Sequence, residues 1–174
     1  NIPKTNKKID RVFLEPGDVE PMEEAVEALE HADLIVLGPG SLYTSVISNL
    51  CVKGVSEALL RSKAPKLYVS NVMTQPGETD NYDVKEHIDA ICQQVGEDFI
   101  DFVICSNENY SKDVLRRYEE KNSKPVEVHK EELKNKGIRV LTASNLIEIS
   151  DEHLVRHNTK VLSGMIYELA LELT

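Results

Sequence analysis

Apolar and polar stretches alternate along the chain, and their periods predict alternating strands and helices. In "DLIVL", residues 33–37, Asp33 is followed by a continuous apolar run, which is typical of a strand buried on both faces of a parallel sheet. Residues 81–95 instead carry apolar side chains at helical spacing, as at Val84, Ile88 and Ile91. Repeated strand–helix units of this kind predict an α/β sandwich with a mostly parallel sheet.

The same reasoning predicts the remaining elements. Strands are expected at 8–16, 65–72, 99–106, 125–129 and 138–144, and helices at 21–32, 41–62 (interrupted near Gly54, or two short ones), 111–122, 130–137 and 150–173. Ser150 is the expected N-cap of the last helix. Ligands of such sheets bind beyond the carboxyl ends of the strands. The segments after Leu37, Val72 and Ile104 are therefore expected along one edge and are the candidate ligand loops.

A glycine turn follows the first buried strand. It reads Gly38, Pro39, Gly40, Ser41, Leu42, Tyr43 and Thr44. Its glycines permit positive φ and close backbone approach, and Ser41 or Thr44 can cap the next helix while free N–H groups face outward. These properties favour a phosphate site, although an ordinary strand-to-helix turn is the alternative. It is not a P-loop, since no Lys-Ser/Thr pair follows, and Tyr43 replaces the third glycine of G-x-G-x-x-G.

A polar loop, residues 70–83, follows the next strand. Its donors and acceptors are Asn71, Thr74, Gln75, Glu78, Thr79 and Asp80. Such a set suits sugar hydroxyls or a base edge better than a bare phosphate, because it lacks cations. The alternative is an exposed turn around Pro76-Gly77.

A basic cluster lies in the segment "RHNTK". It comprises Arg156, His157, Asn158 and Lys160. If the segment is helical, His157 and Lys160 share a face and could approach a phosphate, with a solvated face as the alternative. His153 and His157 have the spacing of a helical zinc site, but no third ligand is evident, and no metal site is expected there.

Three acids, Asp80, Asp83 and Glu86, could hold Mg²⁺ beside a ligand phosphate. The alternative is a helix N-terminus, which favours acids. No Ser/His/Asp or Cys/His nucleophile arrangement is visible in the spacing.

Composition narrows the class of protein. The 174 residues, 41% hydrophobic and 29% charged, predict one α/β domain over residues 1–174. A net charge of −10 without a Lys/Arg block argues against binding to nucleic acid or an anionic membrane. Three distant cysteines suggest free thiols in a reducing compartment, and no signal peptide or membrane span is apparent. The missing initiator Met suggests a piece of a longer protein, and a homo-oligomer is left open.

The motifs "LGPGSLYTSVISNLCVKGVSEAL", "YVSNVMTQPGETDNYD" and "LVRHNTKV" resemble the YvcK family, bacterial gluconeogenesis factors related to the CofD 2-phospho-L-lactate transferases. The resemblance spans nearly the whole chain. It implies a Rossmann-like, three-layer α/β fold, a cytoplasmic protein, and binding of nucleotide sugars such as UDP-N-acetylglucosamine. The family is linked to gluconeogenic growth, cell shape and cell-wall precursor control.

The resemblance covers only the C-terminal part of family members, which open with a Gly-Gly-Gly-Thr-Gly turn that this chain lacks. It implies half a ligand site. Nucleotide or sugar contacts are expected at Gly38, Pro39, Gly40, Ser41, Thr44, Asn71, Thr74 and Glu78, and phosphate contacts at Arg156, His157, Asn158 and Lys160. No catalytic residue or cofactor is assigned. The alternative is a CofD-like transferase with a nucleotide-linked donor, a deazaflavin acceptor and Mg²⁺.

Overall fold

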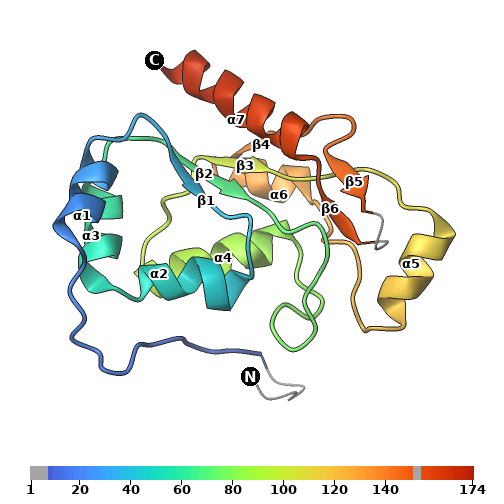
Figure 1. The fold of residues 1–174 in the computed structure, drawn as a ribbon, viewed down its shortest axis with the longest axis horizontal. Coiled ribbons are helices and arrows are strands. Elements are labelled where there is room, and N and C mark those ends of the chain that lie inside the picture. Colours follow the sequence, from blue (N-terminus) through green and yellow to red (C-terminus); the bar gives the residue numbers. More distant parts are fainter. Residues whose placement is uncertain (1–7, 151–153) are drawn as a thin grey trace.

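Four parallel strands form the central sheet (Figure 1). The computed structural model describes residues 8–150 and 154–174. The strands lie in the order β1 (Ile35–Leu37), β2 (Lys66–Val69), β3 (Phe102–Ile104) and β4 (Arg139–Leu141). Leu37 pairs with Tyr68, and Val69 pairs with Ile104. The carboxyl ends of β1, β2 and β3 therefore meet at one edge, as the sequence predicts.

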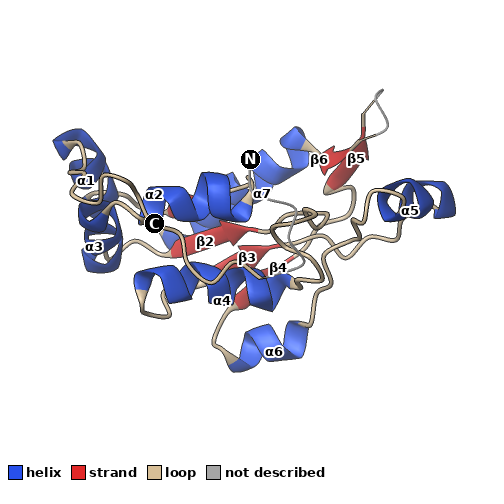
Figure 2. Ribbon diagram, turned by 90° about the horizontal axis from the view of Figure 1, so that it is seen from below, coloured by secondary structure: helices blue, strands red, loops and turns tan. Residues whose placement is uncertain are grey.

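Helices cover both faces of this sheet (Figure 2). Leu67 and Val69 of β2 pack against α7 (Thr159–Leu173), whereas Tyr68 between them packs with the cluster that contains Ile88 and Ile91 of α4 (Val84–Val95). The alternation follows from the period of two along a strand. The predicted α/β sandwich with three layers and a mostly parallel sheet is confirmed.

The other elements surround these layers. They are α1 (Glu23–Glu30), the π-helix η1 (Leu42–Ile47), α2 (Ser48–Leu50), α3 (Lys53–Arg61), α5 (Lys112–Glu119), α6 (Lys130–Asn135), β5 (Ile147–Ile149) and β6 (Val155–His157). Within the described residues, none of the helices combines the length and the apolar character needed to cross a bilayer.

Two predicted strands do not form. Residues 8–14 are extended but join no sheet, because they pack on the helical layer instead: the Cys51 thiol approaches the Val12 carbonyl, and Lys8 pairs with Glu86 at 3.2 Å. The expected strand at 125–129 makes only an isolated bridge between Pro125 and Met73. Its partner is the loop after β2, which is too irregular to continue the pairing.

The last predicted helix begins nine residues later than expected. Antiparallel strands β5 and β6 precede it, and Ser150 lies in the turn between them, where its Oγ accepts a hydrogen bond from the Leu154 N–H. The true N-cap is Asn158, whose Oδ1 accepts hydrogen bonds from Lys160 and Val161. The helical prediction for the start of this segment is wrong because pairing with β5 overrides local propensity.

Candidate functional site

The glycine turn passes close to the end of β2. Gly38 has a φ of +83°, and a Cβ at this position would lie 3.0 Å from the Val69 carbonyl oxygen. Glycine is therefore required here both for the left-handed backbone and for the close approach. The turn is held at the carboxyl edge of the sheet, which is the place predicted for it.

Side chains after the turn take different roles. Leu42 and Tyr43 are buried in the core, and the Tyr43 and Tyr82 hydroxyls lie 2.9 Å apart. Ser41 is the N-cap residue of η1 but makes no side-chain capping bond, and Thr44 is exposed. The expectation that Ser41 or Thr44 caps the helix is wrong. Their hydroxyls are consequently not used to satisfy the first turn.

The polar loop uses two of its hydroxyls to hold itself together. Thr79 is fully buried and its Oγ1 accepts a hydrogen bond of 2.8 Å from the Gln75 N–H. The Oγ1 of Thr74, also buried, accepts one of 3.0 Å from the Lys124 N–H. These two oxygens are therefore used to shape the loop.

Besides the Tyr43–Tyr82 pair, the Gln75 side chain links the polar loop to the glycine turn. The Gln75 amide donates through Nε2 to the Ser41 Oγ at 2.8 Å, and its Oε1 accepts a longer contact of 3.4 Å from Asn71 Nδ2. Two segments that are 34 positions apart in sequence are thereby joined at the sheet edge. The structure brings together the two sets of residues that the sequence selects separately.

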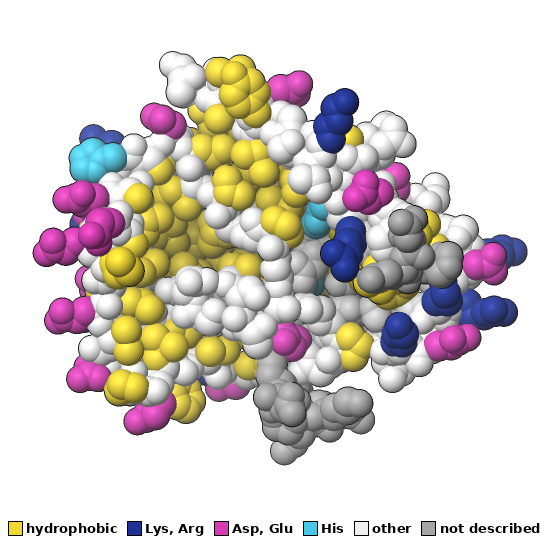
Figure 3. Space-filling model, in the orientation of Figure 1, with side chains coloured by type: hydrophobic (Ala, Val, Ile, Leu, Met, Phe, Trp, Pro, Cys, Tyr) yellow, Lys and Arg dark blue, Asp and Glu magenta, His cyan; other side chains and the backbone are white. Residues whose placement is uncertain are grey.

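A cavity of about 560 Å³ opens beside the polar loop. Thr74, Gln75, Pro76 and Glu78 line one wall. The other residues that line it are Arg117, Tyr118, Lys121, Ser123 and Leu154, most of them from α5 or just after it. The volume is within the range of ligand sites. Figure 3 shows Lys and Arg side chains gathering over the α5 end of the molecule.

Sequence reasoning missed the basic wall of this cavity. Arg117 and Lys121 lie on a short, strongly charged segment, which reads as an ordinary solvated helix face. The sequence did offer one sign that these residues could lie at the site: they follow β3, the third strand whose carboxyl end reaches the same edge of the sheet. The Tyr118 hydroxyl accepts a 2.8 Å hydrogen bond from the Val155 N–H, so α5 is tied to the β5–β6 hairpin.

Glu78 lies between the cavity and η1. Burial raises the pKa of its carboxyl, and the nearby Tyr43 backbone N–H partly opposes that shift. One of its carboxylate oxygens, Oε2, is buried without a hydrogen-bond partner, as is Nε of Arg117 on the other side of the cavity. Both groups are therefore desolvated without full compensation, which is typical of functional sites.

The predicted basic cluster is divided between elements. Arg156 is exposed on β6, and the half-buried His157 follows it, so the two side chains alternate along the strand. Asn158 caps α7, and Lys160 is exposed in its first turn. His157 and Lys160 do not share a helix face, so that prediction is wrong. Burial lowers the pKa of His157, which favours its neutral form.

The three acids considered for Mg²⁺ are occupied by backbone groups. Asp80 accepts from the Gly77 N–H at 2.8 Å, while Asp83 and Glu86 form the capping box of α4. The helix N-terminus alternative therefore holds for Asp83 and Glu86. In the parts of the chain that the structure describes, no three His, Cys, Asp or Glu side chains are grouped to hold a metal ion. His153 lies outside the described residues.

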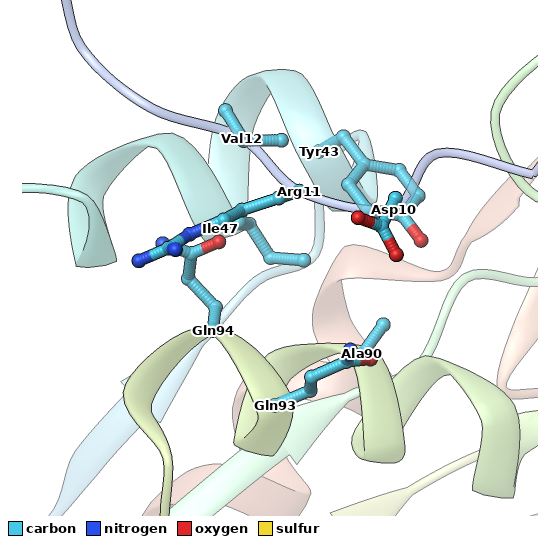
Figure 4. Close-up of a pocket in the computed structure, with 8 residues that line it drawn as sticks. All are labelled: Asp10, Arg11, Val12, Tyr43, Ile47, Ala90, Gln93 and Gln94. Carbon is cyan, nitrogen blue, oxygen red and sulfur yellow. The ribbon is translucent and has the colours of Figure 1, made fainter.

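A second, smaller cavity of about 300 Å³ lies on the other side of η1 (Figure 4). The segment with Asp10 and Arg11 crosses over it, and Gln93 and Gln94 of α4 lie opposite. Tyr43, which lines it, contacts the Tyr82 hydroxyl of the polar loop, but none of its lining residues makes a hydrogen bond to the Ser41–Gln75 pair. The three cysteines, Cys51, Cys92 and Cys105, are free.

Comparison with known proteins agrees with the motif resemblance. A sequence model of the 2-phospho-L-lactate transferase CofD family matches residues 1–146. The gluconeogenesis factor of Halalkalibacterium halodurans is 43% identical over 97% of this chain and 52% of its own length. That of Bacillus subtilis is 37% identical over 98% of this chain and 53% of its own length.

A solved structure is similar as well. A UPF0052-family protein from Bacillus halodurans superposes with a TM-score of 0.89 at 42% identity, covering 95% of this chain and 53% of that one. The chain thus spans about half the length of the relatives that it matches. Since the family model covers most of the sequence and the similar proteins share its fold, the chain belongs to the CofD family and, within it, to the gluconeogenesis factors of the YvcK type.

Proposed function

We propose that the protein is a cytoplasmic regulator that binds a nucleotide sugar such as UDP-N-acetylglucosamine at the carboxyl edge of its sheet. Through that ligand it would connect cell-wall precursor supply with gluconeogenic growth and cell shape. The observation that carries the proposal is the cavity of about 560 Å³ between the polar loop and α5. The family membership and the shared position of the glycine turn support it.

The two walls of this cavity match different parts of such a ligand. Arg117 and Lys121 supply positive charge for a diphosphate, and the Tyr118 ring offers a surface on which a base or sugar can stack. Glu78 provides acceptors for hydroxyl groups. The nearby glycine turn contributes backbone N–H groups for a phosphate. Because the chain spans about half of its relatives, it would supply one side of the site.

The test is calorimetric titration of UDP-N-acetylglucosamine into the full-length polypeptide that contains this chain. Changing Arg117 and Lys121 together to Gln is expected to weaken binding at least about tenfold, since each removes a charged hydrogen-bond donor. Lys134→Gln, which removes a charge from the last turn of α6, is the matched control and should bind like the wild type. No heat at millimolar ligand would contradict the proposal.

The alternative function is a CofD-like transfer of a phospholactyl group from a nucleotide-linked donor to a deazaflavin. Its support is the family match itself. It requires a metal near the phosphates, and the acids Asp80, Asp83 and Glu86 are already engaged by backbone N–H groups in this chain. Metal-dependent turnover of such a donor by the full-length protein would favour this alternative over the regulator.

A further inference from the structure

The hydrogen bond between Gln75 and Ser41 has a chemical consequence for the glycine turn. A serine hydroxyl has one O–H donor and two acceptor lone pairs. The Gln75 Nε2 occupies one lone pair at 2.8 Å. The Ser41 proton must therefore point elsewhere, and Ser41 makes no capping bond to η1 that would use it. The hydroxyl is left as a donor beside the exposed Thr44 and the start of η1.

The surrounding loop holds Gln75 by its backbone and contacts the end of its side chain. Its backbone N–H donates to Thr79 Oγ1, and Thr79 is fully buried. The Thr79 N–H in turn donates to the Gln75 carbonyl at 2.9 Å, so the two residues are joined twice. At the far end of the side chain, the contact from Asn71 Nδ2 to Oε1 favours the amide orientation in which Nε2 faces Ser41.

A phosphate only accepts hydrogen bonds, so a turn without cations must offer it donors. We propose that Gln75 is a positioning residue that makes Ser41 a hydrogen-bond donor to the phosphate of the bound nucleotide. The inference rests on the proposed function and deepens it. Gln75 acts through Ser41 and selects for an anionic group at the glycine turn, whereas the basic wall at α5 supplies charge.

A double-mutant cycle with UDP-N-acetylglucosamine tests the proposal in the full-length protein. Ser41→Ala and Gln75→Leu are each expected to weaken binding about fivefold, the effect of one lost hydrogen bond. Because Gln75 acts through Ser41, the double variant should also be only about fivefold weaker. Gln93→Leu on α4, which makes the same change outside both loops, should bind normally. Independent effects, giving about 25-fold in the double variant, would overturn the inference.

The Gln75→Glu variant gives a measurement that would not change if Gln75 had a purely structural role. A carboxylate can only accept, so it would accept a hydrogen bond from the Ser41 O–H and repel the phosphate. The affinity at pH 7.5 should therefore fall about 20-fold or more. A protonated glutamic acid regains one O–H donor. Affinity relative to wild type should therefore recover at least about threefold as the pH is lowered to 5.0.

The outcomes separate this inference from the proposed function. If Gln75→Glu binds as tightly as wild type at pH 7.5, the amide has the opposite orientation, Ser41 is the donor to Gln75, and the inference is wrong while the function stands. A wild-type protein that binds uridine and UDP-N-acetylglucosamine equally well would also refute the inference, because no phosphate contact would then exist. Absence of any binding by the wild type would refute the function and the inference together.

Discussion

The glycine turn and the polar loop lie side by side at the same sheet edge, but they use their polar groups differently. In the polar loop, Thr74 and Thr79 are buried and accept hydrogen bonds from the chain itself. In the glycine turn, Ser41 and Thr44 make no capping bonds, and Ser41 instead accepts a cross-loop hydrogen bond from Gln75. The polar residues of one loop mainly build it, whereas those of the other are not used to cap the helix that follows.

This difference shows that a polar residue near a predicted site is not automatically a ligand contact. A buried hydroxyl must be satisfied within the protein, because leaving it unpaired is costly. An exposed hydroxyl at the start of a helix does not need a hydrogen-bond partner within the protein. The two loops should therefore respond in opposite ways to mutation: changes in one should alter the stability of the fold, and changes of side chain in the other should alter binding.

The largest effect on stability is expected from the backbone of the glycine turn. Gly38→Ala combines a φ of +83° with a Cβ placed 3.0 Å from the Val69 carbonyl, and should lower the free energy of unfolding by about 3 kcal/mol. Gly77→Ala in the polar loop has a similar φ of +84° but nothing within 4 Å, and should lower it by only about 1 kcal/mol. Urea unfolding measures both. Equal losses would contradict the importance of the close approach.

A smaller effect is expected from the hydroxyl that builds the polar loop. Thr79→Val keeps the shape but removes the acceptor of the Gln75 N–H inside a fully buried site, and should lower the free energy of unfolding by about 2 kcal/mol. Thr44→Val at the exposed position in η1 is the matched control and should change it by less than about 0.5 kcal/mol. If the two variants unfold at the same urea concentration, the contrast between the loops does not hold.

The smallest effect concerns helix capping. Asn158→Ala removes the side-chain acceptor for the Lys160 and Val161 N–H groups at the start of α7, and should cost about 1 kcal/mol of stability. Ser41→Ala, at the N-cap position of η1, has no such bond to lose and should leave the unfolding midpoint nearly unchanged. A clear destabilisation by Ser41→Ala would mean that this hydroxyl supports the fold and is not reserved for a ligand.

The prediction from sequence succeeded where local pattern and topology agree. Continuous apolar runs identified β1, β2 and β3, and the rule for parallel sheets placed the loops after them on one edge. It failed at residues 155–157, where pairing of β6 with β5 replaced the expected helix. It also missed Arg117 and Lys121, because a charged helix face carries no sign of what lies opposite it.

The sequence by itself determined the layered α/β fold, the family and the position of the two candidate loops, since these depend on short-range periodicity and on motifs. Only the tertiary structure decided which of their residues are free. The bond of Thr79 to the Gln75 N–H depends on how the polar loop folds back on itself. The bond of Gln75 to Ser41 depends on the placement of two distant segments, which the pattern of hydrophobic residues does not specify. Burial and hydrogen-bond partners are properties of the packed chain, and they separate the polar residues that build the two loops from those that do not.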